Sequence, residues 1–273
     1  MFKIGISTHG IREVTENWFA GCRAAGIERM ELSIAGDACA DQDYPQIGRW
    51  ARDYGVELWS YHLPYVPWQI ISPSDPAKAP KTLEIYRELI GRAAEIGVRN
   101  FVVHPGDGPN EEGPARQANL NCTKETLSRL ADIAAREGAV VAVENLPRNC
   151  LGRTSREMLE ILSVNDKLRS CFDTNHLLIE DPVHYVEQVG NKIITTHVSD
   201  YDFVDEKHWW PGEGKLNYTA VLDALRRVGY DGPWLYEVNL TIWDRAELCA
   251  AVVDNANRAF RGEFGGPDKI PAK

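Results

Sequence analysis

The chain has 273 residues, 44% apolar and 26% charged, which is typical of a globular protein and unlike disordered or fibrous chains. Its net charge of −10 argues against a nucleic-acid partner, because phosphate binding needs a basic surface. The first residues do not form a signal peptide, no apolar run is long enough to span a bilayer, and the six cysteines form no C-x-x-C pair. We therefore expect a cytoplasmic protein with reduced cysteines and no membrane partner.

Short runs rich in apolar and β-branched residues alternate along the chain with amphipathic stretches. In chain order, the predicted strands cover residues 2–8, 29–35, 57–63, 100–106, 139–146, 168–174, 192–199 and 233–239. Several of these runs are almost continuously apolar, which is typical of strands buried on both faces of a parallel sheet.

Helical patterns lie between these predicted strands. In residues 82–97 the apolar side chains share one face of a helix, and residues 123–138 and 218–230 have the same spacing. The shared face of the first segment consists of Leu83, Tyr86, Leu89, Ile90 and Ala93. Glycines mark the predicted helix ends at Gly26, Gly55, Gly97, Gly138, Gly190 and Gly229.

Strict alternation of strand and helix predicts right-handed parallel crossovers. Eight such units favour a closed (β/α)8 barrel over an open doubly wound sheet. The turn after the first strand, STHGIREVT, also lacks the G-x-G-x-x-G phosphate motif of many open sheets. No linker divides the chain, so we expect residues 1–273 to form one α/β domain, a TIM barrel.

Ionisable residues gather at the predicted carboxyl ends of the strands, the edge at which barrel proteins carry their chemistry. Six of the seven histidines fall at this edge or in the loop after the seventh strand, and only His184 falls in a helix. The residues at this edge are His9, His62, His104, Glu144, Asp173, His176, His197, His208 and Glu237. Three of these histidines also have a structural interpretation: His62 could be a core residue, His104 could bond a loop, and His9 could support its neighbours.

Two of the acids follow strongly apolar runs, Glu144 after VVAV and Glu237 after PWLY. A buried carboxylate without a partner is very costly, so a cation is the natural partner of these glutamates. Asp173 and His197 lie at the same edge and complete a set of four ligands. An oxygen-rich set with one imidazole suits one divalent ion, and it leaves Mn²⁺, Mg²⁺, Co²⁺ and Zn²⁺ open.

Seven motifs, YHLPY, VVHPG, VENLP, CFDTNH, HVSDYD, HWWPGEG and YEVN, resemble the xylose isomerase-like TIM barrel superfamily over nearly the whole chain. That superfamily includes sugar isomerases, ketose 3-epimerases, inosose dehydratases and zinc-dependent apurinic endonucleases. The resemblance implies one divalent ion on Glu144, Asp173, His197 and Glu237, with His176 on substrate oxygens. In the endonucleases the same four places take part in a three-zinc cluster, which His62, His104, His176, Glu206 and His208 would complete here.

The first functional hypothesis is a metal-dependent isomerase or epimerase of a sugar, sugar phosphate or polyol. Glu144 and Glu237 would approach the substrate carbon from opposite sides, so that one removes a proton and the other returns it through an enediolate. The substrate contacts would come from the residues nearest the pocket: His62, His104, His176, His208, Trp209 and Trp210. Alternatively, the two tryptophans only pack the loop, in which Glu213 has a structuring role.

Three alternatives stay open at this point. A multi-zinc phosphoesterase resembling apurinic endonucleases is disfavoured by the net charge and by the scattered basic residues. A metal-dependent dehydratase of a cyclic polyol would use the same ligand set. A non-catalytic sugar-binding relative is disfavoured because both glutamates are present. In each sugar hypothesis the partner is a small molecule, and assembly into a homo-oligomer is also compatible with the sequence.

Overall fold

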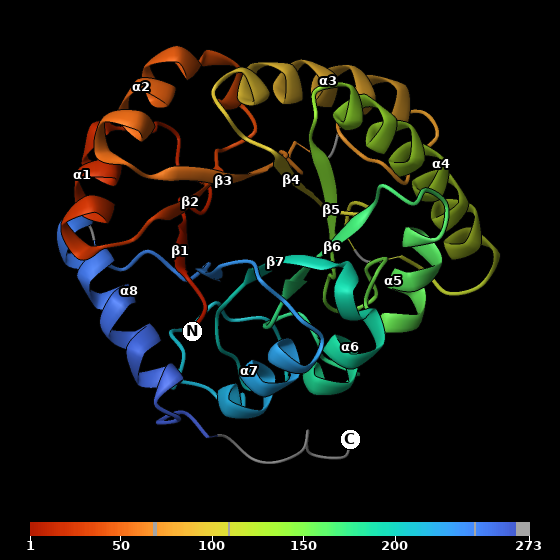
Figure 1. Cartoon of the computed structure of the whole chain (residues 1–273). Coiled ribbons are helices and arrows are strands. Elements are labelled where there is room, and N and C mark those ends of the chain that lie inside the picture. Colours follow the sequence, from red (N-terminus) through yellow and green to blue (C-terminus); the bar gives the residue numbers. More distant parts are fainter. Residues whose placement is uncertain (68–69, 109, 243, 266–273) are drawn as a thin grey trace.

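Eight parallel strands form a barrel that helices surround on the outside (Figure 1). The computed structural model describes residues 1–67, 70–108, 110–242 and 244–265. The strands follow the order β7-β6-β5-β4-β3-β2-β1-β8, and a parallel bridge between Val198 and Tyr236 joins the two ends of that order. The predicted single (β/α)8 TIM barrel is therefore confirmed.

The strands are β1 (Ile4–Ser7), β2 (Arg29–Ser33), β3 (Glu57–His62), β4 (Asn100–Val103), β5 (Val140–Glu144), β6 (Arg169–Asp173), β7 (Ile193–His197) and β8 (Trp234–Tyr236). The α-helices in the described part of the chain are α1 (Glu16–Ala25), α2 (Tyr44–Tyr54), α3 (Ala79–Glu95), α4 (Pro114–Arg136), α5 (Ser155–Leu162), α6 (Pro182–Val189), α7 (Tyr218–Arg227) and α8 (Arg245–Phe260). All eight strands lie where the sequence predicts them.

The observed strands end earlier than the predicted ones. β4 ends at Val103 and β8 at Tyr236, so His104 and Glu237 follow the last paired residue. His9 lies two residues beyond β1, where its φ is 46°. At this edge the backbone leaves the sheet to form the loops around the barrel mouth, and apolar composition does not reveal where that departure occurs.

The predicted helix patterns are also confirmed. The shared apolar face of α3 is buried at each of its five predicted positions. α1 and α2 end at Gly26 and Gly55, both in the left-handed conformation that glycine adopts without steric cost. α1 packs against α8, and at Gly21 a Cβ atom would lie 2.6 Å from the carbonyl oxygen of Arg245. The first and last helices therefore meet closely where the barrel closes.

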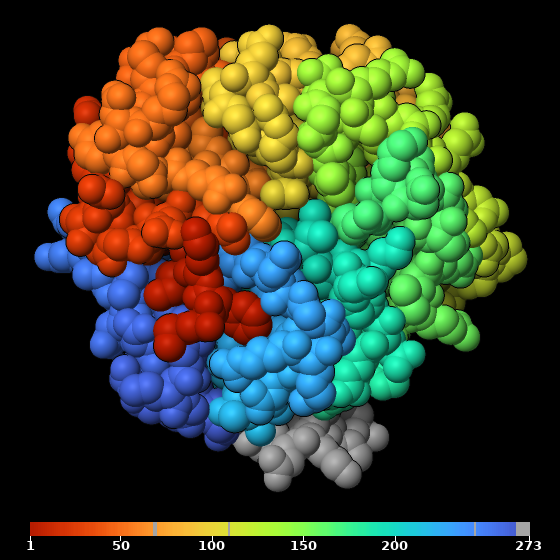
Figure 2. Space-filling model, in the orientation of Figure 1, coloured from red at the N-terminus to blue at the C-terminus, as the bar shows by residue number. Residues whose placement is uncertain are grey.

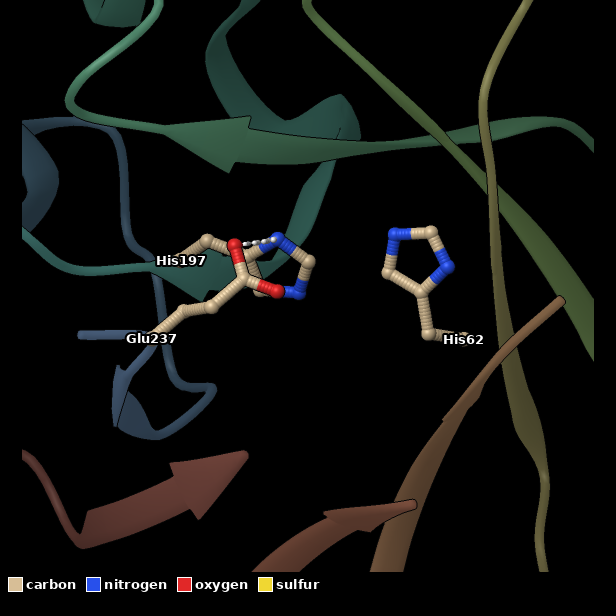
Figure 3. Close-up of side chains that lie close together, drawn as sticks. All are labelled: His62, His197 and Glu237. Carbon is tan, nitrogen blue, oxygen red and sulfur yellow. Dashed lines mark ion pairs between the residues drawn. The ribbon is translucent and has the colours of Figure 1, made fainter. Parts of the chain in front are cut away.

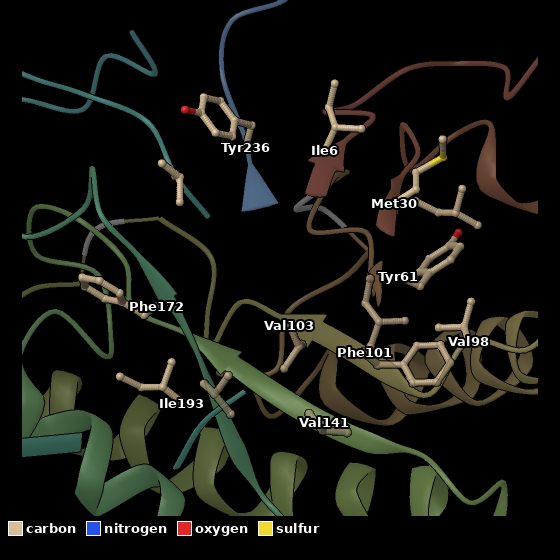
Figure 4. Packing of buried hydrophobic residues seen from close by; sticks show 14 of the residues in the cluster. Ile6, Met30, Tyr61, Val98, Phe101, Val103, Val141, Phe172, Ile193 and Tyr236 are labelled. Carbon is tan, nitrogen blue, oxygen red and sulfur yellow. The ribbon is translucent and has the colours of Figure 1, made fainter. Parts of the chain in front are cut away.

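Side chains on the strands alternate between two environments. Phe101, Val103, Val141 and Phe172 belong to the main hydrophobic cluster (Figure 4). The intervening Val102, Ala142 and Cys171 form a separate small cluster, because successive side chains of a strand point to opposite faces. The main cluster packs against the helices, and the small cluster lies inside the barrel. Glu144 and Asp173 lie two positions beyond Ala142 and Cys171, so they project into the barrel interior as well.

The first residues of the chain pack against a segment of its C-terminal part, since the ring centre of Phe2 lies 5.5 Å from that of Tyr230. Figure 2 shows the first residues (red) beside segments from the C-terminal part of the chain (blue). Among the described residues, no helix combines the length and apolar character that a membrane span requires.

Candidate metal and acid–base site

The four predicted ligands meet inside the carboxyl end of the barrel. Glu144, Asp173 and His197 are the last residues of β5, β6 and β7, and Glu237 directly follows β8. One ligand atom from each residue lies within 4.8 Å of the others. All four side chains are buried, and Glu237 retains the largest exposed fraction, 6%. The set expected from the sequence is thus brought together, and whether an ion binds it stays a prediction.

The ring of His197 lies at the centre of this set. Its Nδ1 is 3.2 Å from Oε1 of Glu144 and 3.3 Å from Oε2 of Glu237, and the second of these pairs is drawn in Figure 3. Oδ2 of Asp173 is 3.9 Å from the same nitrogen. Three carboxylate oxygens and one imidazole nitrogen therefore face a common point.

Burial and mutual charge shift the pKa values of these groups in different directions. Burial raises the pKa of Asp173, and the charges of Glu144 and Glu237 raise it further, to well above its ordinary value. Burial would also raise the pKa of Glu144, but the charges of His197 and His104 outweigh it and hold this pKa well below the ordinary value. Without additional positive charge, the three carboxylates cannot all ionise easily.

The donor set fits a divalent cation. Oδ2 of Asp173 is fully buried and accepts no hydrogen bond from any residue that the structure describes. Its other oxygen, Oδ1, accepts the backbone N–H of Asn175 at 2.6 Å. An orphaned carboxylate oxygen beside two further carboxylates and an imidazole has the chemistry of a ligand for a divalent cation, since cations compensate buried negative charge.

The second oxygens of the two glutamates face different histidines. Oε2 of Glu144 lies 3.1 Å from Nε2 of His62 and 3.3 Å from Nε2 of His104. Oε1 of Glu237 lies 3.5 Å from Nδ1 of His9. Each glutamate therefore directs one oxygen to the common centre and the other to histidines outside it. Imidazole neighbours of this kind favour the charged form of a carboxylate.

Two further predicted contacts, His176 and His208, lie on the β6 and β7 side of the mouth. Nδ1 of His176 bonds the carbonyl of Asn145 at 2.9 Å, and burial lowers the pKa of His176 to about 4, so this ring is neutral. Nδ1 of His208 lies 3.2 Å from the carbonyl oxygen of Glu237 and 3.4 Å from Oγ of Ser199. Both rings are held near the predicted ligands.

The long β7–α7 loop, residues 198–217, is organised by one buried carboxylate. Asp200 accepts backbone N–H groups from four positions of this loop: Tyr201, Gly212, Gly214 and Leu216. A Cβ at Gly214 would lie 2.3 Å from Oδ1 of Asp200, so only glycine fits there. Glu213 accepts the N–H of Trp210 at 3.1 Å, which agrees with its expected structuring role.

The two tryptophans of this loop have different surroundings. Trp209 pairs with Asp200 in an antiparallel bridge, and the ammonium of Lys207 lies 5.9 Å from the centre of the Trp209 ring. Trp210 packs against the main hydrophobic cluster, with its ring centre 6.3 Å from that of Tyr236. Substrate contact by either tryptophan stays a prediction, and the packing interpretation has direct support for Trp210.

Three residues near the site are not among the site residues predicted from the sequence, although Arg148 was expected near the mouth as one of several scattered basic residues. Glu31 of β2 is fully buried and contacts His197. The ring of Tyr65 stacks on His104 with centres 4.3 Å apart. Arg148, at a φ of 54°, pairs with Asp205 and Glu206 at 2.8 and 3.2 Å. Of the three, only Glu31 could have been identified from the sequence, because an acid within a buried strand needs a partner just as Glu144 does.

The fold and the site define this protein as a (β/α)8 barrel with a buried carboxylate–imidazole centre at the carboxyl ends of its strands. The sequence profile described as "Xylose isomerase-like TIM barrel" matches residues 19–252, and the chain belongs to this family. The identity of the family was expected from the sequence motifs and is confirmed.

Individual relatives share about a third of their residues or fewer with this chain over the matched segments. An uncharacterized protein from Methanocaldococcus jannaschii is 32% identical over 189 residues, 66% of this chain and 63% of that protein. A ketose 3-epimerase from Arthrobacter globiformis is 30% identical over 175 residues, 61% of this chain and 58% of the relative. The matches thus span about six-tenths of these relatives' lengths. The crystal structure of a D-tagatose 3-epimerase-like protein is 24% identical, with a TM-score of 0.78 over 95% of this chain and 98% of that one, and shows the shared fold.

Proposed function

We propose that this protein is a divalent-metal-dependent isomerase or epimerase of a small sugar or polyol. The observation that carries the proposal is the paired arrangement of Glu144 and Glu237. Each directs one oxygen to a common centre within 3.3 Å of Nδ1 of His197 and the other to a separate histidine. The similarity to a ketose 3-epimerase supports the same class of reaction.

The ion would be held by Glu144, Asp173, His197 and Glu237. When bound, a divalent ion polarises a carbonyl and acidifies the neighbouring C–H bond. The ligand set is compatible with Mn²⁺, Mg²⁺, Co²⁺ and Zn²⁺, because it combines oxygen ligands with one imidazole.

The protein's own contribution is to move and hold protons. One glutamate removes the substrate proton and the other returns it. The result is either an inverted configuration at the carbon that lost the proton or a carbonyl at a new position. His62 and His104 contact Glu144, and His9 contacts Glu237, so each carboxylate has histidine neighbours that stabilise its charged form. His176 is neutral and buried beside the ligands, where it can hydrogen-bond a substrate hydroxyl.

An uncharged sugar suits the mouth better than a sugar phosphate. Arg148 is a basic residue beside the mouth, and it is already paired with Asp205 and Glu206. A phosphate group would have to displace one of these carboxylates to reach the guanidinium, and it would approach an acidic surface. We therefore propose a non-phosphorylated substrate.

The multi-zinc phosphoesterase stays a second candidate, because His62, His104 and Glu144 form another set of ligand atoms within 4.8 Å of one another. Against it stands the environment of Glu206. This acid would hold a third ion with His176 and His208, but its carboxylate pairs with Arg148. Within the described ranges, no close set of ligand atoms includes Glu206 or His208. The arginine thus supplies the positive charge at that point.

Proton exchange with solvent tests the proposal. Candidate ketoses would be incubated with the metal-loaded protein in D₂O and followed by NMR, beside Glu144→Gln and Glu237→Gln. Glutamine keeps the size of the side chain but cannot accept the proton. We expect turnover to fall by roughly 10²–10⁴-fold in both variants, while the variant that keeps the base for a given ketose still exchanges the C–H with deuterium.

Three outcomes would contradict the proposal. Near-normal turnover in both variants would make the glutamates ligands only. Conversion in the wild type without deuterium incorporation would indicate a hydride shift between carbons. Three zinc ions per purified chain would favour the phosphoesterase instead.

A further inference from the structure

A buried carboxylate on the inner wall of the barrel has no part in the predicted ligand set. Glu31 is 0% exposed and sits in the middle of β2. The register between β2 and β3 shifts between Met30 and Glu31, so that Glu31 pairs with Ser60 rather than with Trp59. Such irregularities commonly re-aim a side chain. Here the shift places the hydroxyl of Ser60 where it donates to Oε2 of Glu31 at 2.8 Å.

The same carboxylate reaches across the barrel interior to β7. Nε2 of His197 lies 3.1 Å from Oε2 of Glu31 and 3.0 Å from its Oε1. The opposite nitrogen, Nδ1, faces Glu144, Glu237 and Asp173. The imidazole therefore has one edge on Glu31 and the other edge on the predicted metal position.

These contacts fix which nitrogen of the ring carries a proton. An ionised carboxylate only accepts hydrogen bonds, and the Ser60 hydroxyl already donates to it. Nε2 of His197 must then be the donor. A histidine that ligates a metal ion is neutral, so the ligating ring has its lone pair on Nδ1. Ligating histidines are commonly oriented in this way by a carboxylate on the far nitrogen.

We propose that Glu31 is a positioning residue that holds His197 in the tautomer and orientation needed for metal binding through Nδ1. The inference rests on the metal dependence in the proposed function and on no particular substrate. The competing interpretation is that Glu31 and His197 form only a core ion pair. That interpretation predicts a change in stability and no specific effect on metal affinity.

Metal affinity separates the two interpretations. We would compare wild type, Glu31→Gln and Ser60→Ala by competition with a chelator for Zn²⁺ and Mn²⁺. As a matched control we choose Thr195→Val, which alters a buried polar residue two positions before His197 on the same strand. Its hydroxyl accepts Nε1–H of Trp59 at 3.2 Å and belongs to neither the predicted ligands nor the Glu31 contacts.

We expect the dissociation constant of the metal to rise about 10–100-fold in Glu31→Gln. It should rise less in Ser60→Ala, which keeps the carboxylate but removes one of its anchors, and stay unchanged in Thr195→Val. If Glu31→Gln does not fold, the Ser60→Ala result alone decides. Long-range ¹H–¹⁵N NMR of the Zn²⁺-loaded wild type should show His197 protonated on Nε2.

Three results would overturn the inference: unchanged affinity in Glu31→Gln and Ser60→Ala, an equal loss of affinity in Thr195→Val, or a proton on Nδ1 with the metal bound elsewhere. A wild-type protein that binds no divalent ion would instead overturn the proposed function itself. The two failures are therefore distinguishable in one set of measurements.

Discussion

At the scale of single residues, Asp173 shows how the backbone prepares a ligand. Its backbone N–H donates to Oδ1 of Asn145 at 2.8 Å, and its carbonyl accepts Nδ2–H of the same asparagine at 2.9 Å. Oδ1 of Asp173 is occupied by the N–H of Asn175, and only Oδ2 is left over. The side chain thus has little freedom to turn away when a cation is absent.

Asp173→Asn should abolish tight metal binding while leaving the fold intact. The amide keeps the shape of the carboxylate but removes a negative charge from a site where burial and two glutamates already oppose ionisation. Elemental analysis of the purified variant should find less than one ion in ten chains, against one per chain in the wild type.

The control for that variant is Asp181→Asn. Asp181 caps the N-terminus of α6 by accepting the N–H groups of Val183 and His184, and it lies outside the ligand set. Its replacement should cost at most about 1 kcal/mol of stability in urea unfolding and leave the metal content unchanged. Equal metal content in the two variants would remove Asp173 from the predicted site.

At the scale of elements, the β7–α7 loop is a fixed structure held at both of its sides. Asn175 accepts the N–H of Lys207 at 2.9 Å, and the N–H of Asn239 donates to the carbonyl of His208 at 2.9 Å. Together with Asp200, these bonds hold His208 at a φ of 51°. Left-handed backbone in a non-glycine residue is costly and persists where surrounding contacts impose it.

The two adjacent tryptophans of this loop should respond differently to truncation. Trp210→Ala removes contacts with the hydrophobic cluster and should lower the free energy of unfolding by about 2 kcal/mol or more. Trp209→Ala should change stability by less than about 0.5 kcal/mol and raise KM for the substrate. Denaturant titration and steady-state kinetics measure both effects, and the reverse pattern would assign the substrate wall to Trp210.

At the scale of the whole molecule, the site joins strands from most of the barrel. Glu31 and His62 come from β2 and β3, the ligands from β5, β6 and β7, and Glu237 follows β8. An ion bound at this point would therefore link distant parts of the chain in the folded state. The unfolded chain does not bring these side chains together, so binding stabilises the fold by mass action.

Metal removal should lower the unfolding temperature of the wild-type protein. An ion at about 100 times its Kd adds about 2.7 kcal/mol to the stability of the folded state. Calorimetry with EDTA and then with added Mn²⁺, Co²⁺ or Zn²⁺ would measure the shift, and Asp173→Asn should show none. An unfolding temperature that no divalent ion changes in the wild type would contradict the predicted site.

The sequence by itself determined the barrel and grouped the four predicted ligands at one edge of it. Strand and helix patterns are local, because they follow from spacings of two and of three to four residues along the chain. Parallel strands place their carboxyl ends on one face, so Glu144, Asp173, His197 and Glu237 could be grouped without coordinates. The family resemblance rested on the same local motifs.

The tertiary structure alone decided how the site is supported. Glu31 and His197 are 166 residues apart in the sequence, and their contact depends on a register shift between β2 and β3 that no local pattern predicts. The pairing of Arg148 with Glu206 likewise depends on two loops meeting across the mouth. The curvature of a barrel and the register of its strands decide which inward-pointing side chains meet. The residue pattern of a single strand contains neither of these.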